Sequence, residues 1–155
     1  RLLKKLAKNG IAIKFITLHV GLGTFAPLSE TNFTSGKLHQ EIFEISASTA
    51  KFLNRAKKEG RPIVAVGTTV LRALESSAGK YRTLTKLNGV TTLFIREGYV
   101  FKFVDSLVTN FHVPKSSLLM LVSAFAGHKN ILRLYDFAIM KKLRLFSFGD
   151  GMLIR

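Results

Sequence analysis

The sequence predicts a mixed α/β fold in a single unit that spans residues 1–155. Short runs rich in β-branched and aromatic residues alternate with stretches whose apolar residues recur at helical spacing, and this alternation is typical of α/β proteins. Glycines and prolines fall between these runs, and no repeat or flexible linker divides the chain. A chain of 155 residues also matches the commonest domain size.

The N-terminal third is expected to hold two helices, a buried strand and a second, short strand. In residues 2–8, leucines share one helical face and lysines another, and Asn9-Gly10 is a stop signal. Because this helix has no N-cap, we expect the chain to be cut from a longer one. The next elements are a buried strand, a long loop that ends in a short strand, and a helix (residues 11–20, 26–44 with 41–45, and 46–59).

The middle of the chain predicts a strand-turn-helix unit. Residues 62–66 are wholly apolar, as expected of a strand covered on both faces, and Gly67 leads into a helix that contains Leu71 and Leu74. The remaining elements are a hairpin around Gly98, a strand, two helices and a final strand (residues 93–95 with 100–104, 107–111, 118–125, 131–141 and 143–148).

Charge is the main compositional signal. Twenty-four Lys and Arg against nine Asp and Glu give a formal net charge of +15, which favours a polyanionic partner such as nucleic acid. The alternative is that the lysines only solvate helix faces. The absence of cysteine excludes disulfides, thiolate metal sites and a cysteine nucleophile. The longest nearly apolar stretch, residues 117–127, is shorter than the roughly 20 residues that cross a bilayer, so no membrane span is predicted.

A glycine motif follows the first strand, which His19 closes. The segment Gly21-Leu22-Gly23-Thr24-Phe25-Ala26 matches the G-x-G-x-x-[GA] pattern of dinucleotide-binding folds. However, Pro27 and the loop-like residues after it form no amphipathic helix, which argues against a nicotinamide-dependent oxidoreductase. The remaining interpretation is that the glycines let backbone or ligand approach closely at a strand end.

A second candidate site lies at Gly67-Thr68-Thr69, where a strand ends and a helix begins. Unpaired amides and the helix dipole favour a carboxylate or phosphate there. Alternatively, Thr68 is only an N-cap. Arg72 and Glu75 follow on the same helix, at a spacing that a simple surface ion pair would also have.

The segment from Asn110 to Ser117 is the densest group of reactive side chains. It stands where a strand gives way to a helix, and ligands of α/β proteins bind at such strand ends. Its His112 titrates near neutral pH when unperturbed. A lone histidine is also commonly a structural residue, and this alternative stays open for His112 and for His19.

Two acids are expected at strand ends. Asp150, between two glycines, follows the predicted final strand, and Asp105 is similarly placed, although it also suits a cap or turn. No serine occupies a G-x-S-x-G elbow, which excludes the usual hydrolase triad. His39 and Glu41 lie one residue apart, which is weak evidence for a metal site.

These segments together resemble the tRNA ribosyltransferase-isomerase family of queuosine synthesis. The matching stretches run in the family's order along nearly the whole chain: FITLHVGLGTFAPL, LHQE, VAVGTTVLRALES, VDSLVTNFHVPKSSLLMLVSAFAG and LRLFSFGDGMLI (residues 15–28, 38–41, 64–76, 104–127 and 143–154). Members of that family are much longer. The resemblance therefore implies the C-terminal part of an α/β barrel-like catalytic domain, without the family's N-terminal portion and inserted β-barrel domain.

The resemblance also implies a reaction. The ribosyl group of S-adenosylmethionine is transferred to the aminomethyl group of a 7-deazaguanine at the tRNA wobble position and rebuilt as an epoxycyclopentane, so adenine and methionine leave. S-adenosylmethionine is then a co-substrate, and tRNA is the partner. The resemblance implies no permanent cofactor, no metal and no membrane contact. It also implies a cytoplasmic enzyme that is monomeric at full length. The alternative is a non-catalytic remnant, a basic domain that binds RNA weakly.

Within that resemblance, the candidate residues fall into three groups. The candidates for catalysis are four groups that can hold or move a proton (His19, His112, Asp105 and Asp150). The candidates for binding S-adenosylmethionine are small or polar residues at strand ends (Gly21, Gly23, Thr24, Gly67, Thr68, Thr69 and Asn110). The candidates for contact with the tRNA backbone are two cations (Arg72 and Lys115).

Overall fold

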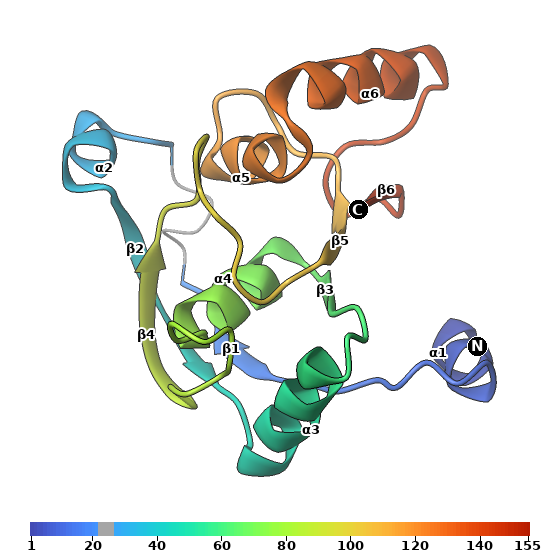
Figure 1. Cartoon of the computed structure of the whole chain (residues 1–155). Helices are drawn as coiled ribbons and strands as arrows, with labels where there is room; N and C mark the ends of the chain where they lie inside the picture. The colour runs from blue at the N-terminus through green and yellow to red at the C-terminus, as the bar shows by residue number, and fades with distance from the viewer. Residues whose placement is uncertain (22–26) are drawn as a thin grey trace.

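The structure is a computed structural model that describes residues 1–21 and 27–155. Its strands form two sheets of three (Figure 1). The first sheet is antiparallel, in the order β1-β2-β4 (Thr17–His19, Lys37–Glu44 and Asn88–Leu93). The second has the order β3-β5-β6 (Val64–Val66, Ser106–Asn110 and Gly151–Ile154), with β3 parallel and β6 antiparallel to β5.

Six helices connect and cover these sheets in the described part of the chain: α1 Leu2–Lys8, α2 Glu30–Ser35, α3 Ala47–Lys58, α4 Thr68–Ser77, α5 Ser117–Ala126 and α6 His128–Met140. Helix α4 lies between the two sheets and contacts strands of both (Figure 1). Helices α5 and α6 pack together at the end of the molecule opposite α3. Helix α1 stands apart and buries none of its residues.

The hydrophobic core lies around α4. Leu71 and Leu74 of this helix are buried together with Phe43 of the first sheet, Leu107 of the second and Leu121 of α5. These residues belong to one cluster that joins both sheets. The mixed α/β class predicted from the sequence is therefore confirmed, and the sheets show no closed barrel within the described residues.

Most predicted elements are confirmed, with ends that differ by a few residues. The confirmed helices are α1, α3, α4, α5 and α6, and the confirmed strands are β3 and β5. The burial predicted for β3 is wrong, because only its central residue, Ala65, is buried, whereas Val64 is 48% exposed and Val66 is 67% exposed. An apolar sequence does not show whether a second layer exists to cover the strand.

Two N-terminal predictions are also wrong. The strand predicted for residues 11–20 is reduced to Thr17–His19, because the only strand that pairs with it, β2, reaches no further in the described residues. The loop predicted for residues 26–44 instead holds helix α2, whereas the short strand predicted for residues 41–45 is confirmed as the end of the longer strand β2. The signals for α2 were present in the sequence: Ser29 and Asn32 form a capping box, and Gly36 closes the helix in the left-handed conformation.

Two C-terminal predictions are wrong for local reasons. The predicted hairpin of residues 93–95 with 100–104 does not form, because β4 ends at Leu93 and pairs with β2. The predicted strand at residues 143–148 is irregular backbone, in which Phe146 has a positive φ of 58° that a strand does not allow. The last strand is β6, so Asp150 precedes a strand instead of following one.

Candidate functional site

Three strand ends meet at one edge of the β3-β5-β6 sheet. Because β3 and β5 are parallel, their carboxyl ends lie side by side, and the Gly67 amide donates to the Val108 carbonyl at 2.8 Å. Strand β6 begins at the same edge, where Gly151 pairs with Asn110. The Asn110 Nδ2 group donates to the Asp150 carbonyl at 3.0 Å. This edge therefore gathers the predicted residues Gly67, Asn110 and Asp150, at the type of strand end where α/β proteins bind ligands.

Helix α4 begins at this edge. Its N-cap is Gly67, with a φ of 103°, so the interpretation of Thr68 as the N-cap is wrong: Thr68 is the first helical residue and is buried. Gly67 has no side chain that can accept from the first-turn amides, which lack acceptors within the helix. Because these amides and the helix dipole attract negative charge, the geometry suits a carboxylate or phosphate beside Thr68 and Thr69.

His112 lies two residues beyond Asn110 and is 6% exposed. Its Nε2 atom and the Thr109 hydroxyl are 3.0 Å apart. Its backbone amide donates to the Tyr135 hydroxyl at 2.7 Å, and that hydroxyl donates to the His112 carbonyl at 3.1 Å. Burial lowers the pKa of His112 from 6.5 to about 4, so the imidazole is neutral at pH 7.

Asp150 is held by Arg144. The carboxylate accepts from the Arg144 backbone amide at 2.8 Å and from Arg144 Nε at 2.9 Å. The hydrogen bond from the guanidinium lowers the pKa of Asp150 below its usual value, and the carboxylate is therefore ionised at neutral pH. It can balance positive charge, but it is a poor proton donor.

Asp105 lies at the other end of β5, and His19 belongs to the other sheet. Asp105 precedes β5, at the opposite end of the strand from Asn110, a separation of roughly 16 Å at the rise of an extended strand. It pairs with Lys57 and accepts from the Ile63 amide at 2.8 Å, so it joins α3 to the start of β3. His19 ends β1 in the other sheet, where it is exposed and lies 4.0 Å from Glu44.

The interpretation of Arg72 and Glu75 as a surface ion pair is wrong. Arg72 is 2% exposed and pairs with the buried Glu41 of β2. Glu75 is also buried and accepts four hydrogen bonds of 2.8–3.0 Å, from the Tyr99 hydroxyl and the amides of residues 102–104. The Arg72 guanidinium therefore makes its contact inside the protein, whereas the sequence had suggested an exposed contact with the tRNA backbone.

The other predicted residues have simpler surroundings. Lys115 is exposed and adopts a positive φ of 58°. Gly21 is exposed, and the predictions for Gly23 and Thr24 lie outside the described residues. Residues 1–21 and 27–155 contain no group of three or more side chains that could hold a metal ion, so His39 and Glu41 gain no support as ligands.

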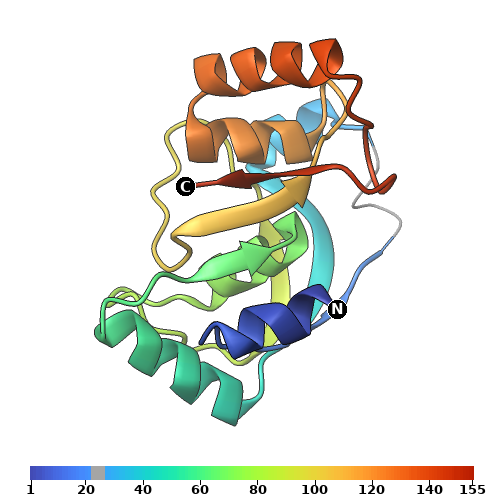
Figure 2. The ribbon, with the colours of Figure 1, turned by 90° about the vertical axis from the view of Figure 1, so that its right-hand side faces the viewer.

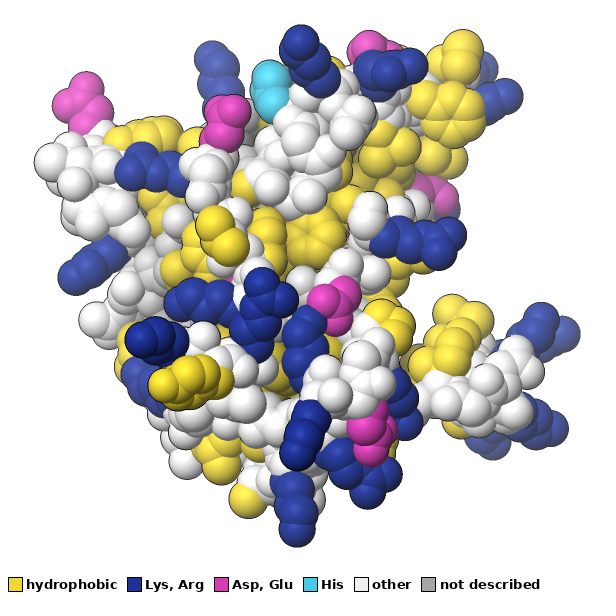
Figure 3. All heavy atoms as spheres, in the orientation of Figure 1, with side chains coloured by type: hydrophobic (Ala, Val, Ile, Leu, Met, Phe, Trp, Pro, Cys, Tyr) yellow, Lys and Arg dark blue, Asp and Glu magenta, His cyan; other side chains and the backbone are white. Residues whose placement is uncertain are grey.

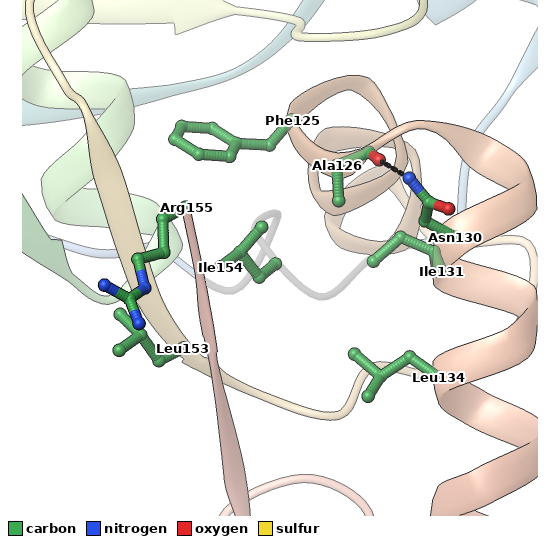
Figure 4. A pocket seen from close by; sticks show the side chains of 8 residues that line it. All are labelled: Phe125, Ala126, Asn130, Ile131, Leu134, Leu153, Ile154 and Arg155. Carbon is green, nitrogen blue, oxygen red and sulfur yellow. Dashed lines mark hydrogen bonds between the residues drawn. The ribbon is translucent and has the colours of Figure 1, made fainter.

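A separate hollow of about 350 Å³ lies between α6 and the far end of β6 (Figure 4). Apolar side chains of Ile131, Leu134 and Leu153 line it, and the Arg155 guanidinium stands at its side (Figure 4). None of the predicted site residues lines this hollow. It lies beside the end of β6 that pairs with Leu107, away from Asn110 and Asp150.

Sequence reasoning missed several residues that support the site. Tyr135, distant in sequence, bonds His112, and Arg144, in irregular backbone, bonds Asp150. The local sequence pattern gave no sign of either contact. Glu41 and Arg72 lie within two stretches on which the family resemblance rests, and only the fold shows that they pair.

The structure is a mixed α/β protein whose candidate site lies where β3 and β5 end and β6 begins. The chain belongs to the queuosine biosynthesis protein family, whose model matches residues 1–154.

Similar proteins carry a more specific name. The chain is 53% identical over 154 residues to the S-adenosylmethionine:tRNA ribosyltransferase-isomerase of Halothermothrix orenii and 49% identical over 153 residues to that of Carboxydothermus hydrogenoformans. It also resembles the crystal structure of S-adenosylmethionine tRNA ribosyltransferase from Thermotoga maritima, with a TM-score of 0.79 and 39% identity over 99% of this chain and 48% of that one.

The chain is shorter than these relatives. The two curated relatives match over 99% of this chain but only 45% of their own length. Among the described residues, no helix has the length and apolar character needed to cross a membrane.

Proposed function

We propose that this chain supplies part of the active site of an S-adenosylmethionine-dependent tRNA ribosyltransferase-isomerase in queuosine modification. The observation that carries the proposal is the meeting of Gly67, Asn110 and Asp150 at one sheet edge, in a chain whose relatives bear that enzyme's name. Ribosyl transfer from S-adenosylmethionine requires sites for a carboxylate, a sulfonium and a departing adenine, and this edge offers groups suited to the first two.

In this proposal, the first-turn amides of α4 bind the methionine carboxylate or a phosphate of the tRNA, beside Thr68 and Thr69. The ionised Asp150 balances the positive charge of the sulfonium. Asn110, already bonded to the Asp150 carbonyl, keeps that strand end in place and presents its remaining amide oxygen.

The proton transfers need a base and a donor. The proton on the carbon beside the sulfonium is acidified, so its removal by a base gives an ylide, and adenine needs a proton as it leaves. The neutral His112 has an unprotonated ring nitrogen that can accept a proton, but a pKa of about 4 makes it a weak base, so in the proposal its surroundings must change when the substrates bind. His19, in the other sheet, and Asp105, at the other end of β5, remain candidates in the proposal.

The test is adenine release. The chain is incubated with S-adenosylmethionine and precursor tRNA, both alone and joined to the remaining portion of the Halothermothrix orenii relative. Joined protein that releases adenine supports the proposal, and His112→Ala in it should lower turnover at least about tenfold. Joined protein that folds but releases no adenine contradicts it.

A second candidate function is a basic domain that binds RNA without catalysis. It is favoured by the net charge of +15 and by the match to less than half of each relative's length. Adenine release and filter binding of tRNA together separate the two functions. A binding domain without catalysis would hold tRNA on a filter but release no adenine, either alone or joined to the relative's portion.

A further inference from the structure

A tight turn between α4 and β4 places an aromatic side chain between two cations. Lys80, Tyr81 and Arg82 lie at the tip of this turn, and all three side chains are exposed, Tyr81 to 82%. Each of them is therefore accessible to a partner. We refer to residues 79–83 as the exposed turn.

The backbone of the exposed turn is held at its base. The Gly79 amide donates to the Thr83 carbonyl at 2.8 Å, and Ala78 and Leu84 form a β-bridge next to it. The Asn54 side chain of α3 bonds both the amide and the carbonyl of the buried Leu84, at 2.7 and 3.1 Å. The tip residues are thus positioned before a partner binds, which reduces the entropy that binding costs.

The cations around the exposed turn have no acidic partner among the described residues. Residues 76–95 contain three cations and no Asp or Glu (Lys80, Arg82 and Lys86). None of the three forms an ion pair within the described part of the chain, whereas Arg55 and Arg61 both pair with Glu59. The positive charge at the turn is therefore available to an anionic partner.

The exposed turn and the candidate site lie at opposite ends of α4. The turn follows the last residues of this ten-residue helix, so roughly 15 Å separates it from Thr68 at the rise of an α-helix. The exposed Lys102 adds a cation toward the same end of α4, because its amide bonds Glu75. The gold loop that carries Lys102 runs along the left-hand side of Figure 2, and Lys and Arg side chains gather over α4 in Figure 3. One polynucleotide can therefore reach both ends of the helix.

We propose that the exposed turn binds a single-stranded part of the tRNA. Tyr81 stacks on an unpaired base, and Lys80 and Arg82 contact phosphates beside it, since rings and cations are combined in this way by proteins that bind single-stranded RNA. An acidic membrane surface fits less well, because membrane binding needs a larger apolar area than one ring. The identity of the RNA as tRNA rests on the proposed function, whereas the contact itself involves none of the reacting groups.

Binding of two RNAs to the chain tests the stacking contact. A single-stranded RNA oligonucleotide and the same sequence as a duplex are titrated by fluorescence anisotropy at fixed salt. Tyr81→Ala should weaken binding of the single strand about tenfold and change binding of the duplex by less than about twofold, because stacking needs an unpaired base. Tyr81→Phe keeps the ring and should retain binding. The matched control Phe137→Ala removes an exposed ring on α6 and should retain binding of both RNAs.

The salt dependence of single-strand binding tests the cations. Lys80→Ala/Arg82→Gly should lower the slope of log affinity against log salt by about 1.4, because each phosphate contact in a single strand contributes about 0.7. Glycine adopts the positive φ of 56° at Arg82 without strain, so the turn is retained. Tyr81→Ala should leave the slope unchanged, since the tyrosine side chain is uncharged. The matched control Lys129→Ala/Arg133→Ala changes two exposed cations on α6 and should lower the slope by less.

Three results would overturn the proposal, with circular dichroism showing that each variant folds. These are equal affinities for Tyr81→Ala and Phe137→Ala, equal slopes for the two double variants, and a loss in Tyr81→Ala of binding to acidic phospholipid vesicles but not to RNA. Adenine release by the joined protein separates this contact from the proposed function. An unchanged KM for tRNA in Tyr81→Ala overturns the contact alone, whereas weaker RNA binding by Tyr81→Ala in protein that releases no adenine supports the contact and contradicts the catalytic function.

Discussion

His112 illustrates how burial changes the chemistry of one residue. Its side chain is enclosed at the end of β5, with the Thr109 hydroxyl as partner of Nε2, and burial lowers the pKa to about 4. Its position after a strand was visible in the sequence. The lowered pKa was not visible in the sequence, because the burial that causes it depends on how α6 covers the strand end.

The lowered pKa predicts a pH dependence of stability. Between pH 6.5 and about pH 4, the unfolded chain binds a proton at His112 that the folded chain does not, so acidification over this range favours unfolding. The full effect is on the order of 3 kcal/mol. Urea unfolding measured across this range should show a shallower pH dependence for His112→Gln than for the unaltered chain, with the exposed His128→Gln as control. Equal dependence for all three proteins would show that His112 does not titrate in this way.

Glu75 illustrates a residue whose role depends on contacts distant in sequence. Its buried carboxylate accepts from the Tyr99 hydroxyl and from the amides of Lys102, Phe103 and Val104. This cluster holds residues 99–104 against α4 and replaces the hairpin that the sequence predicted. A periodic pattern placed Glu75 on the helix correctly but gave no sign that its partners are backbone amides.

We expect Glu75→Ala to lower the free energy of unfolding by about 3 kcal/mol, because buried amides would lose a charged acceptor. Chemical denaturation of the purified variant measures this loss. The exposed Glu97→Ala provides the control and should change stability by less than about 0.5 kcal/mol. A loss no greater than that of the control would mean that water replaces the carboxylate without cost.

At the scale of elements, helices were predicted better than strands. Helices α3, α4 and α5 have periodic apolar residues and local stop or cap signals, such as the Ser116 hydroxyl that accepts from the Leu119 amide at 3.1 Å. A strand requires a partner elsewhere in the chain. Residues 11–16, which are apolar except for Lys14, have no strand partner among the described residues, and the sequence alone gave no way to know this.

The contact between α6 and β5 also lay beyond prediction and has a measurable consequence. The Tyr135 hydroxyl bonds both the amide and the carbonyl of His112. Tyr135→Phe leaves this amide without its acceptor, at a cost of about 1–2 kcal/mol, so we expect its hydrogen exchange to accelerate at least about tenfold. The exposed Tyr81→Phe should leave the exchange unchanged. Unchanged exchange in Tyr135→Phe would show that this bond does not fix the strand end.

At the scale of the whole molecule, the sequence predicted the fold class and the family but not the two-sheet arrangement. Of the candidate residues, Gly67, Asn110 and Asp150 meet at one sheet edge, whereas Asp105 lies at the far end of β5. The reason is that strand order, and not sequence distance, decides which strand ends are neighbours. The order β3-β5-β6 omits the intervening β4, which joins the other sheet.

The overall charge predicts how binding responds to salt. With a net charge of +15, an interaction with tRNA that neutralises six or more phosphates should weaken by about a thousandfold between 50 and 200 mM salt. Filter binding over this range gives the slope of log affinity against log salt. If the exposed Lys115 contacts a phosphate, Lys115→Ala should reduce the slope by about one.

The control for this measurement is Lys129→Ala, an exposed lysine on α6 outside the strand-end segment, which should lower the slope less. Arg72 is expected to leave the slope unchanged, because its guanidinium is paired with Glu41 inside the protein and its substitution acts through folding. Binding that is insensitive to salt would contradict an electrostatic interaction with RNA. Equal slopes for Lys115→Ala and the unaltered chain would remove Lys115 from the tRNA contact and leave the interaction to the lysines and arginines elsewhere on the surface.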